Sequence, residues 1–346
     1  MKENISDLII GYLTENPATS SSKMYAELAI GVSFATFKRQ LSKLVETDLV
    51  ITLGRQKSVK YLLSPAYEVL HPVNISRYFE KEIDERTIKS TFNFNLMPHI
   101  LSQITLFTTK ELDQLSALQN EFKENISNLS SSLYSKEMER LAIDLSWKSS
   151  QIEGNTYSLL ETERLLKEKE TAAGKPKDDA VMLLNHKEAI DFIVAHPDYV
   201  VPLTIRSLED IHSILVKELD VDRNIRQRRV GISGTNYIPL DNEHQIREAL
   251  TGMCELINAK ENVFEKALLA LVLLCYIQAF TDGNKRTARI VSNAILIAHQ
   301  HCPLSFRTVD SVDYKKAMLI FYEQNNINAF KEIFKTQFEF AVKTYF

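Results

Sequence analysis

The chain has 346 residues, of which 45% are hydrophobic and 25% charged, and its formal net charge is −4. This length allows two or three globular domains with ample core, and the near-balanced charge excludes a general attraction to nucleic acid or membranes. Glycine and proline are scarce, with nine of each, so a mainly α fold of long helices and short connections is predicted.

Three cysteines, Cys254, Cys275 and Cys302, show neither disulfide nor metal-ligand spacing. An odd, unpatterned set of this kind is typical of reduced thiols in a reducing compartment. The N-terminal residues lack the apolar core of a signal peptide. The longest apolar run, 267–280, is too short to span a bilayer. These features predict a cytoplasmic protein without a membrane segment.

Residues 1–65 show three short amphipathic helical patterns and then two alternating runs, 49–53 and 58–63, joined by a turn. This order resembles a small α+β winged helix-turn-helix domain, with Ser33 capping the third helix. In such domains the third helix and the wing carry DNA contacts. The corresponding residues here are Thr36, Lys38, Arg39, Lys43, Arg55 and Lys57. Acidic residues nearly cancel the charge, so a dimerisation or docking role is equally open.

Residues 66–108 mix polar and aromatic stretches with prolines and are interpreted as a connecting segment. From 109 to 346 the pattern is helical almost throughout. Within this part, apolar spacing predicts an amphipathic helix over about 136–154, which Gly154 ends. Glu153 then lies in the last turn, where the helix dipole disfavours a carboxylate, so a cationic partner is expected.

Residues 225–239 contain two short β-type runs around a Gly/Ser/Asn turn, and they predict a β-hairpin. Arg226, Arg228 and Arg229 in this hairpin could serve an acidic target or phosphates. They could equally form a solvated edge that resists aggregation.

Residues 278–289 read QAFTDGNKRTAR and lie between two apolar, helical stretches. We therefore predict a helix, a tight loop over 281–284 and a second helix. Free backbone N–H groups, a positive dipole end and the guanidinium groups of Arg286 and Arg289 would make a polyphosphate site. Asp282 is the ligand type that Mg²⁺ uses beside phosphates.

The same stretch resembles the signature HPFx[DE]GN[GK]RxxR of the Fic (Fido) family. The matching residues are Phe280, Asp282, Gly283, Asn284, Lys285, Arg286 and Arg289. Gln278 stands where the family has its catalytic histidine, and Ala279 where it has proline. The resemblance implies a helical Fic domain over 109–346 that transfers AMP from ATP to a Ser, Thr or Tyr hydroxyl of a target protein or of itself. It also implies a homodimer.

The resemblance also assigns roles to these residues. Gln278, Asp282, Asn284 and Arg286 would take the catalytic positions, with Asp282 holding Mg²⁺. Nucleotide contacts would come from Gly283, Asn284, Lys285, Arg286 and Arg289. The hairpin would be the family's flap, with Val230, Gly231, Ile232 and Tyr237 holding a target segment by strand addition.

A second similarity lies upstream, where residues 149–154 resemble the inhibitory motif [ST]xxxE[GN] of autoinhibited Fic proteins. Its residues here are Ser149, Glu153 and Gly154. By this resemblance the cationic partner of Glu153 is Arg289, the arginine that would otherwise hold the γ-phosphate. Occupying it would prevent the productive pose of ATP.

Glutamine at position 278 changes the expected chemistry, because an amide cannot remove a proton from the attacking hydroxyl. The rest of the signature is intact, so positioning and charge stabilisation remain available. Three hypotheses follow: a slow or atypical AMP transferase, an ATP-binding pseudoenzyme that regulates transcription through its winged helix, or a different phosphate transfer that uses another base.

Overall fold

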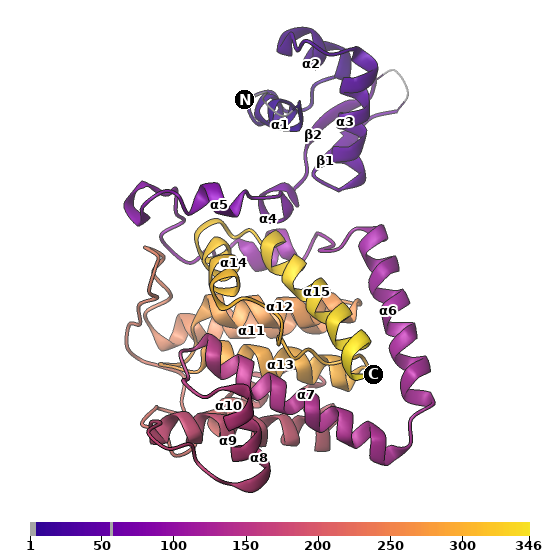
Figure 1. Ribbon diagram of the computed structural model, residues 1–346. Coiled ribbons are helices and arrows are strands. Elements are labelled where there is room, and N and C mark those ends of the chain that lie inside the picture. Colours follow the sequence, from indigo (N-terminus) through magenta and orange to yellow (C-terminus); the bar gives the residue numbers. More distant parts are fainter. Residues whose placement is uncertain (1–4, 56–57) are drawn as a thin grey trace.

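The structure is a computed structural model that describes residues 5–55 and 58–346. Its first five elements form a small N-terminal module, which lies at the top of Figure 1, apart from the helical body. They are α1 (Ile5–Glu15), α2 (Ser21–Leu28), α3 (Phe34–Glu46), β1 (Val50–Leu53) and β2 (Lys60–Leu63). The helices and paired strands predicted for this part are present, and its assignment as a winged-helix domain stays a prediction.

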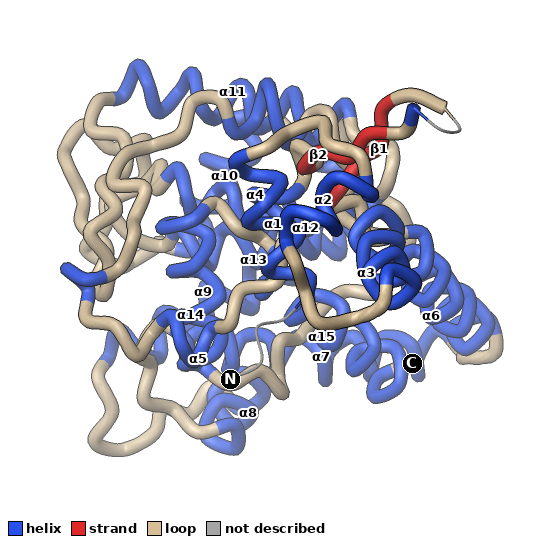
Figure 2. The backbone as a smooth tube through the Cα atoms, turned by 90° about the horizontal axis from the view of Figure 1, so that it is seen from above, coloured by secondary structure: helices blue, strands red, loops and turns tan. Residues whose placement is uncertain are grey.

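Helix α3 forms where its cap and its apolar spacing agree. The Ser33 side chain accepts a hydrogen bond from the Thr36 N–H, and Phe37, Leu41 and Leu44 are buried at helical spacing. Phe34, three residues before Phe37, is 41% exposed. The strands β1 and β2 pair antiparallel, and Figure 2 shows them as the only strands (red) in the described chain.

The connecting segment is not a loose linker. It contains α4 (Tyr67–Leu70), α5 (Ile75–Tyr78), η2 (Ile83–Glu85) and η3 (Leu96–Leu101). Arg86 forms a buried ion pair with Glu323 at 3.2 Å, and the Lys89 N–H donates to the carbonyl of the same glutamate at 2.8 Å. The segment is therefore anchored on the body below the N-terminal module (Figure 1).

The body is a stack of long helices. They are α6 (Thr109–Ser127), α7 (Ser131–Ile152), α8 (Leu159–Glu168), α9 (Lys177–Ala195), η4 (Pro197–Val200), α10 (Ile205–Leu215), α11 (Glu243–Ala259), α12 (Val263–Ile277), α13 (Asn284–Ala298), α14 (Ser311–Gln324) and α15 (Asn328–Tyr345). The predicted mainly α fold is confirmed.

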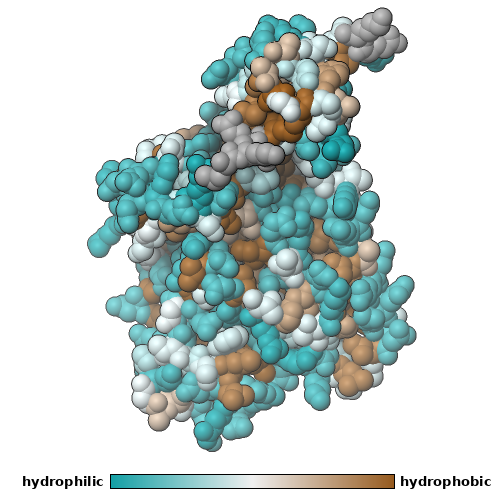
Figure 3. All heavy atoms as spheres, turned by 45° about the horizontal axis from the view of Figure 1, so that its top comes forward, coloured by the Kyte–Doolittle hydropathy of each residue, from teal (hydrophilic) through white to brown (hydrophobic). Residues whose placement is uncertain are grey.

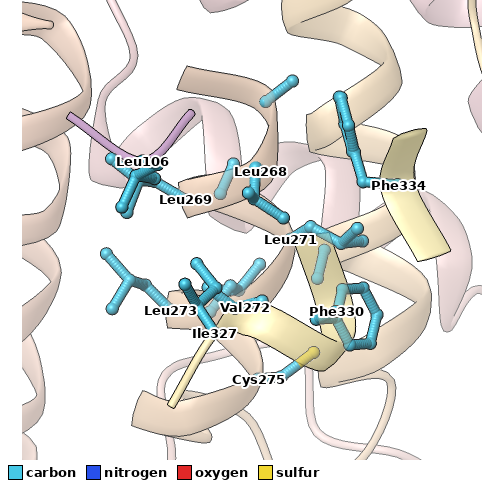
Figure 4. Packing of buried hydrophobic residues seen from close by; sticks show 14 of the residues in the cluster. Leu106, Leu268, Leu269, Leu271, Val272, Leu273, Cys275, Ile327, Phe330 and Phe334 are labelled. Carbon is cyan, nitrogen blue, oxygen red and sulfur yellow. The ribbon is translucent and has the colours of Figure 1, made fainter. Parts of the chain in front are cut away.

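Helix α12 lies at the centre of the core. Every residue from Ala267 to Ile277 is fully buried, as expected for a helix that is apolar on all sides. Figure 4 shows its leucines against Phe330 and Phe334 of α15 and against Leu106. This packing holds α12 in place, and with it the start of the loop that follows.

The surface drawn in Figure 3 is mainly polar, with apolar side chains in scattered patches. Within residues 5–55 and 58–346, no helix has the length and apolar character of a membrane-spanning segment.

The β-hairpin predicted for residues 225–239 is wrong, because this fully described segment contains no strands paired with each other. Ile238 instead forms an isolated parallel bridge with Thr91 of the connecting segment. The buried Arg226 side chain explains the difference. It donates to the carbonyl oxygens of Arg228 and Leu240, which a hairpin ladder would need as acceptors, and to that of Gln278.

Candidate functional site

The loop between α12 and α13 depends on two residues with left-handed backbone. Gln278 ends α12 with φ of 54°, and its N–H donates to the Leu274 carbonyl. Gly283 precedes α13 with φ of 80°, and a Cβ there would come within 3.3 Å of the His212 ring. Glycine is therefore required, and the predicted order of helix, tight loop and helix is present.

Asn284 holds this loop in shape with its side chain. Its Oδ1 accepts the Phe280 N–H at 2.9 Å, and its Nδ2 donates to the Phe280 carbonyl at 2.7 Å. The same Nδ2 lies 3.2 Å from Oε1 of Gln278. Because the amide is buried and used within the protein, Asn284 offers a ligand its backbone N–H rather than its side chain.

Gln278, at the position of the family's histidine, is bonded at both ends of its amide. Its Nε2 donates to the Cys275 carbonyl at 2.6 Å, while its Oε1 accepts from Asn284. The side chain is 8% exposed. This arrangement holds Gln278 at the pocket wall but provides no proton acceptor of basic strength.

Arg286 and Asp282 form the next pair. The Arg286 Nη2 donates to Asp282 Oδ2 at 3.0 Å. The guanidinium is buried, with its Nε unpaired within the described residues, whereas the Asp282 side chain is 63% exposed. Asp282 therefore keeps a carboxylate oxygen available to a ligand or cation.

Glu153 connects α7 to α13 through two cations. Its Oε1 accepts from Arg289 Nη2 at 2.9 Å, and its Oε2 accepts from Lys285 Nζ at 3.2 Å. Burial raises the pKa of the Glu153 carboxyl, but the charges of Arg289 and Lys285 outweigh this and hold its pKa below the usual value. The ion pair predicted between Glu153 and Arg289 is present, and Lys285 is an additional partner.

The other side of Arg289 is held by Ser149. The Ser149 Oγ accepts from Arg289 Nε at 2.7 Å, and its carbonyl accepts from Nη2 at 3.0 Å. His186 Nε2 lies 2.6 Å from the same Oγ, within hydrogen-bonding distance. Burial, and then the charges of Arg289 and Arg286, hold the pKa of His186 well below its usual value. His186 is thus a neutral structural residue.

Glu153, Gln278 and residues 281–285 line a pocket of about 380 Å³, whereas Arg286 and Arg289 lie buried behind it. The loop and the first turn of α13 form one wall, residues 230–233 form a second, and Tyr314, Lys315 and Met318 of α14 contribute to a third. The described residues contain no cluster of three or more His, Cys, Asp or Glu side chains that could hold a metal ion. A cation at Asp282 would therefore need further oxygen atoms from its ligand.

Of the residues predicted to dock a target, Val230, Gly231 and Ile232 line this pocket. The prediction for Tyr237 is wrong. Its side chain is 2% exposed, and its hydroxyl donates to the Tyr276 carbonyl at 3.0 Å. The Tyr237 ring therefore packs in the core and does not face a partner.

The residues predicted to contact DNA differ in their surroundings. Lys38 Nζ donates to the Tyr61 hydroxyl at 2.8 Å, and the Thr36 hydroxyl lies 3.0 Å from that of Ser33. Lys43 is exposed and lines a cleft between α3 and the connecting segment. Arg39 and Arg55 are exposed, and Lys57 lies outside the described residues.

Sequence reasoning missed the side chains that support the loop from other helices. His212 stacks on Phe280 with ring centroids 3.6 Å apart and lies 3.0 Å from the Asp282 carbonyl. Tyr314 of α14 lies under the guanidinium of Arg289 at 5.3 Å. Neither residue belongs to a local pattern, so only the packing of α10 and α14 identifies them.

The fold and the loop together define a helical protein in which the N-terminus of α13 lies beside the carboxylate of Glu153, paired with Arg289 and Lys285. Residues 202–296 match the Fic/DOC family. The chain is 27% identical over 176 residues to the protein adenylyltransferase Fic of Nematostella vectensis, covering 49% of this chain and 40% of that protein. The corresponding protein of Culex quinquefasciatus is 27% identical, with 44% and 31% covered. The chain thus spans less than half the length of these relatives.

Solved structures share the fold. A fragment of Fic-1 from C. elegans superposes with a TM-score of 0.57 and 20% identity, covering 68% of this chain and 70% of that one. A Fic domain-containing signaling protein from Bacteroides thetaiotaomicron gives a TM-score of 0.57 and 18% identity, covering 67% and 94%.

Proposed function

We propose that this chain binds ATP at the N-terminus of α13 and is built to transfer AMP to a protein hydroxyl. The observation that carries the proposal is the pocket at the N-terminus of α13, which Asp282, Gly283, Asn284 and Lys285 line. The buried Arg286 and Arg289 follow in the next two turns of the same helix. Buried guanidinium groups beside free helix N–H groups favour a polyphosphate ligand. The relatives named adenylyltransferases support AMP as the transferred group.

In this proposal each residue of the loop has one task. The backbone N–H groups of the first turn of α13 bind phosphate oxygens, and Lys285 and Arg286 balance their charge. Asp282 would hold Mg²⁺, which shares its remaining coordination with phosphates and water and neutralises phosphate charge when bound. The exposed carboxylate fits this role because Mg²⁺ commonly takes only one or two protein carboxylates.

Glu153 is proposed to inhibit the site. A γ-phosphate would need Arg289, yet this arginine is paired with Glu153 and bonded to Ser149. Lys285, a second phosphate ligand, is paired with the same carboxylate. Productive binding would therefore require the Glu153 side chain to leave both cations.

Transfer would form a bond between the target hydroxyl oxygen and the α-phosphorus, break the bond to the β-phosphate and release pyrophosphate. The hydroxyl proton needs an acceptor, and the amide of Gln278 is not one. The bonded amide therefore favours a second candidate, an ATP-binding protein with little or no transfer. DNA contact through residues 1–65 and assembly as a homodimer remain predictions.

The test compares wild type with Glu153→Gly and, as a matched control, Glu163→Gly on α8. Calorimetry with ATP and Mg²⁺ should show tighter binding for Glu153→Gly, and mass spectrometry should show more AMP added to the protein. Unchanged binding and modification in Glu153→Gly would refute inhibition by Glu153. Binding without any added AMP would favour the second candidate.

A further inference from the structure

A second cavity lies away from the candidate site. It is a groove of about 660 Å³ between α11 and residues 92–102 of the connecting segment, and it shares no lining residue with the nucleotide pocket. Its floor is apolar, with the buried side chains of Phe92, Met97 and Leu256. Phe94, at the rim, is 51% exposed. The size is that of a specific binding cavity.

Gly252 keeps the α11 side of this groove open. It lies inside α11, where glycine weakens a helix relative to alanine. Its backbone is not left-handed, and a Cβ would meet nothing nearer than Met97 Cε at 4.0 Å. Neither conformation nor crowding within the described chain requires glycine here, and the missing side chain leaves this part of the groove free for an occupant.

The groove also carries uncompensated negative charge. Glu248 and Glu255 of α11 line it and are exposed, and neither has an ion pair with any other residue that the structure describes. The one cation of the lining, Lys260, is already paired with Glu265 at 3.1 Å and donates to the Ile104 carbonyl at 2.6 Å. An occupant with positive charge is therefore favoured.

We propose that this groove binds an amphipathic helix of a partner protein, with apolar residues on the floor and basic residues on the two glutamates. Glu248 and Glu255 are seven residues apart, which is about two turns or 10 Å along α11. A helix lying beside α11 matches this spacing with Lys or Arg at i and i+7, and it places residues i+3 and i+4 over the groove.

Such a partner would contact residues that pack against Tyr276, close to the α12–α13 loop. Phe92 stacks on Tyr276 with centroids 4.8 Å apart, and the Asn93 N–H donates to the Tyr276 hydroxyl at 2.9 Å. Tyr276 lies two residues before Gln278. Binding in the groove should therefore slow amide exchange in residues 92–94.

The experiment uses the full chain and a fluorescein-labelled helical peptide of about 14 residues, or four turns. The peptide has Lys at i and i+7 and Leu at i+3 and i+4. Two comparison peptides keep the composition in scrambled order or replace Lys by Glu. Fluorescence anisotropy should show binding of the first peptide only.

Variants of the chain make the test specific. Glu248→Gln combined with Glu255→Gln should weaken binding about threefold to tenfold, while the matched pair Glu15→Gln and Glu46→Gln should not change it. Gly252→Trp should block the groove, and Gly252→Ala should leave it open. Equal binding of the scrambled peptide, no binding up to about 1 mM, or unchanged affinity in the double glutamine variant would each overturn the proposal.

Discussion

The amide oxygen of Gln278 lies 3.2 Å from Nδ2 of Asn284. This contact links the residue at the family's histidine position to the residue that holds the α12–α13 loop in shape. Because Gln278 also donates to the Cys275 carbonyl, its side chain connects the last turn of α12 to Asn284 and stabilises the loop. A substitution at position 278 thus changes both the chemistry of the site and one support of its geometry.

The first prediction concerns Gln278→His in the Glu153→Gly background. Histidine restores a base with a pKa near neutrality, so AMP transfer should rise by about 10²-fold or more. Mass spectrometry of the protein after incubation with ATP measures it, and Gln278→Asn is the control without a base. A wild type as fast as the variant would mean that another residue is the base. A silent variant that still binds ATP would point to the second candidate function.

The second prediction concerns the phosphate site. Arg286→Ala removes a charge-assisted contact and should weaken binding of ATP with Mg²⁺ by about 1.5–3 kcal/mol in calorimetry. Arg206→Ala, whose side chain is 89% exposed on α10, is the control. Equal affinity in Arg286→Ala and wild type, with both proteins folded, would exclude this phosphate site.

The third prediction concerns pH. The pKa of His186 in the folded protein is well below its usual value of 6.5. As pH falls below 6.5, His186 is therefore protonated in the unfolded chain but stays neutral in the folded protein. The stability due to neutral His186 is present above pH 6.5 and is lost as pH falls below it, at up to about 1.4 kcal/mol per pH unit. Urea unfolding between pH 7 and 5 should show a shallower loss for His186→Gln. The comparison with wild type is needed because His212 and His301 also have lowered pKa values. An identical pH dependence would contradict the assignment.

The fourth prediction concerns the anchor between the connecting segment and residues 228–236. Arg86 is paired with the buried Glu323 and donates to the Gly234 carbonyl at 2.8 Å. Arg86→Met leaves Glu323 uncompensated and should cost about 3–5 kcal/mol of stability. Adding Glu323→Gln should restore part of the stability. Amide hydrogen exchange around Gly234 should nevertheless be faster than in wild type in both variants, because both lack the bond from Arg86. Slow exchange there in both would show that Arg86 does not hold this loop.

The fifth prediction concerns the N-terminal module. If Arg39 and Arg55 contact DNA phosphates, anisotropy on random and promoter-derived duplexes should show affinity falling with salt, with a log–log slope near −0.9 per contact. Reversing both to glutamate should abolish binding. No binding at about 50 mM salt would favour dimerisation instead.

Local chemistry in the sequence determines several features of this protein by itself. The turn at Gly283, the end of α7 before Gly154 and the cap of α3 by Ser33 depend on residues only a few positions apart. Such short-range rules can be read from the sequence because the same backbone geometry recurs wherever these residues stand. The partner predicted for Glu153 is also correct, although the family motif rather than the spacing supplied Arg289.

Tertiary packing decides the rest. Several contacts of the site join helices that are far apart in the chain. They are the contacts of Lys285 with Glu153, of Ser149 with Arg289 and His186, and of Tyr314 with Arg289. Residues 225–239 have the alternation of a hairpin, yet the buried Arg226 occupies the carbonyl groups that a ladder would use. An alternating pattern indicates only which side chains would share a face of a strand. It does not indicate which groups the backbone carbonyls will bond. The third acceptor of Arg226, the Gln278 carbonyl, and the space for a buried guanidinium exist only once α12 and α13 are packed.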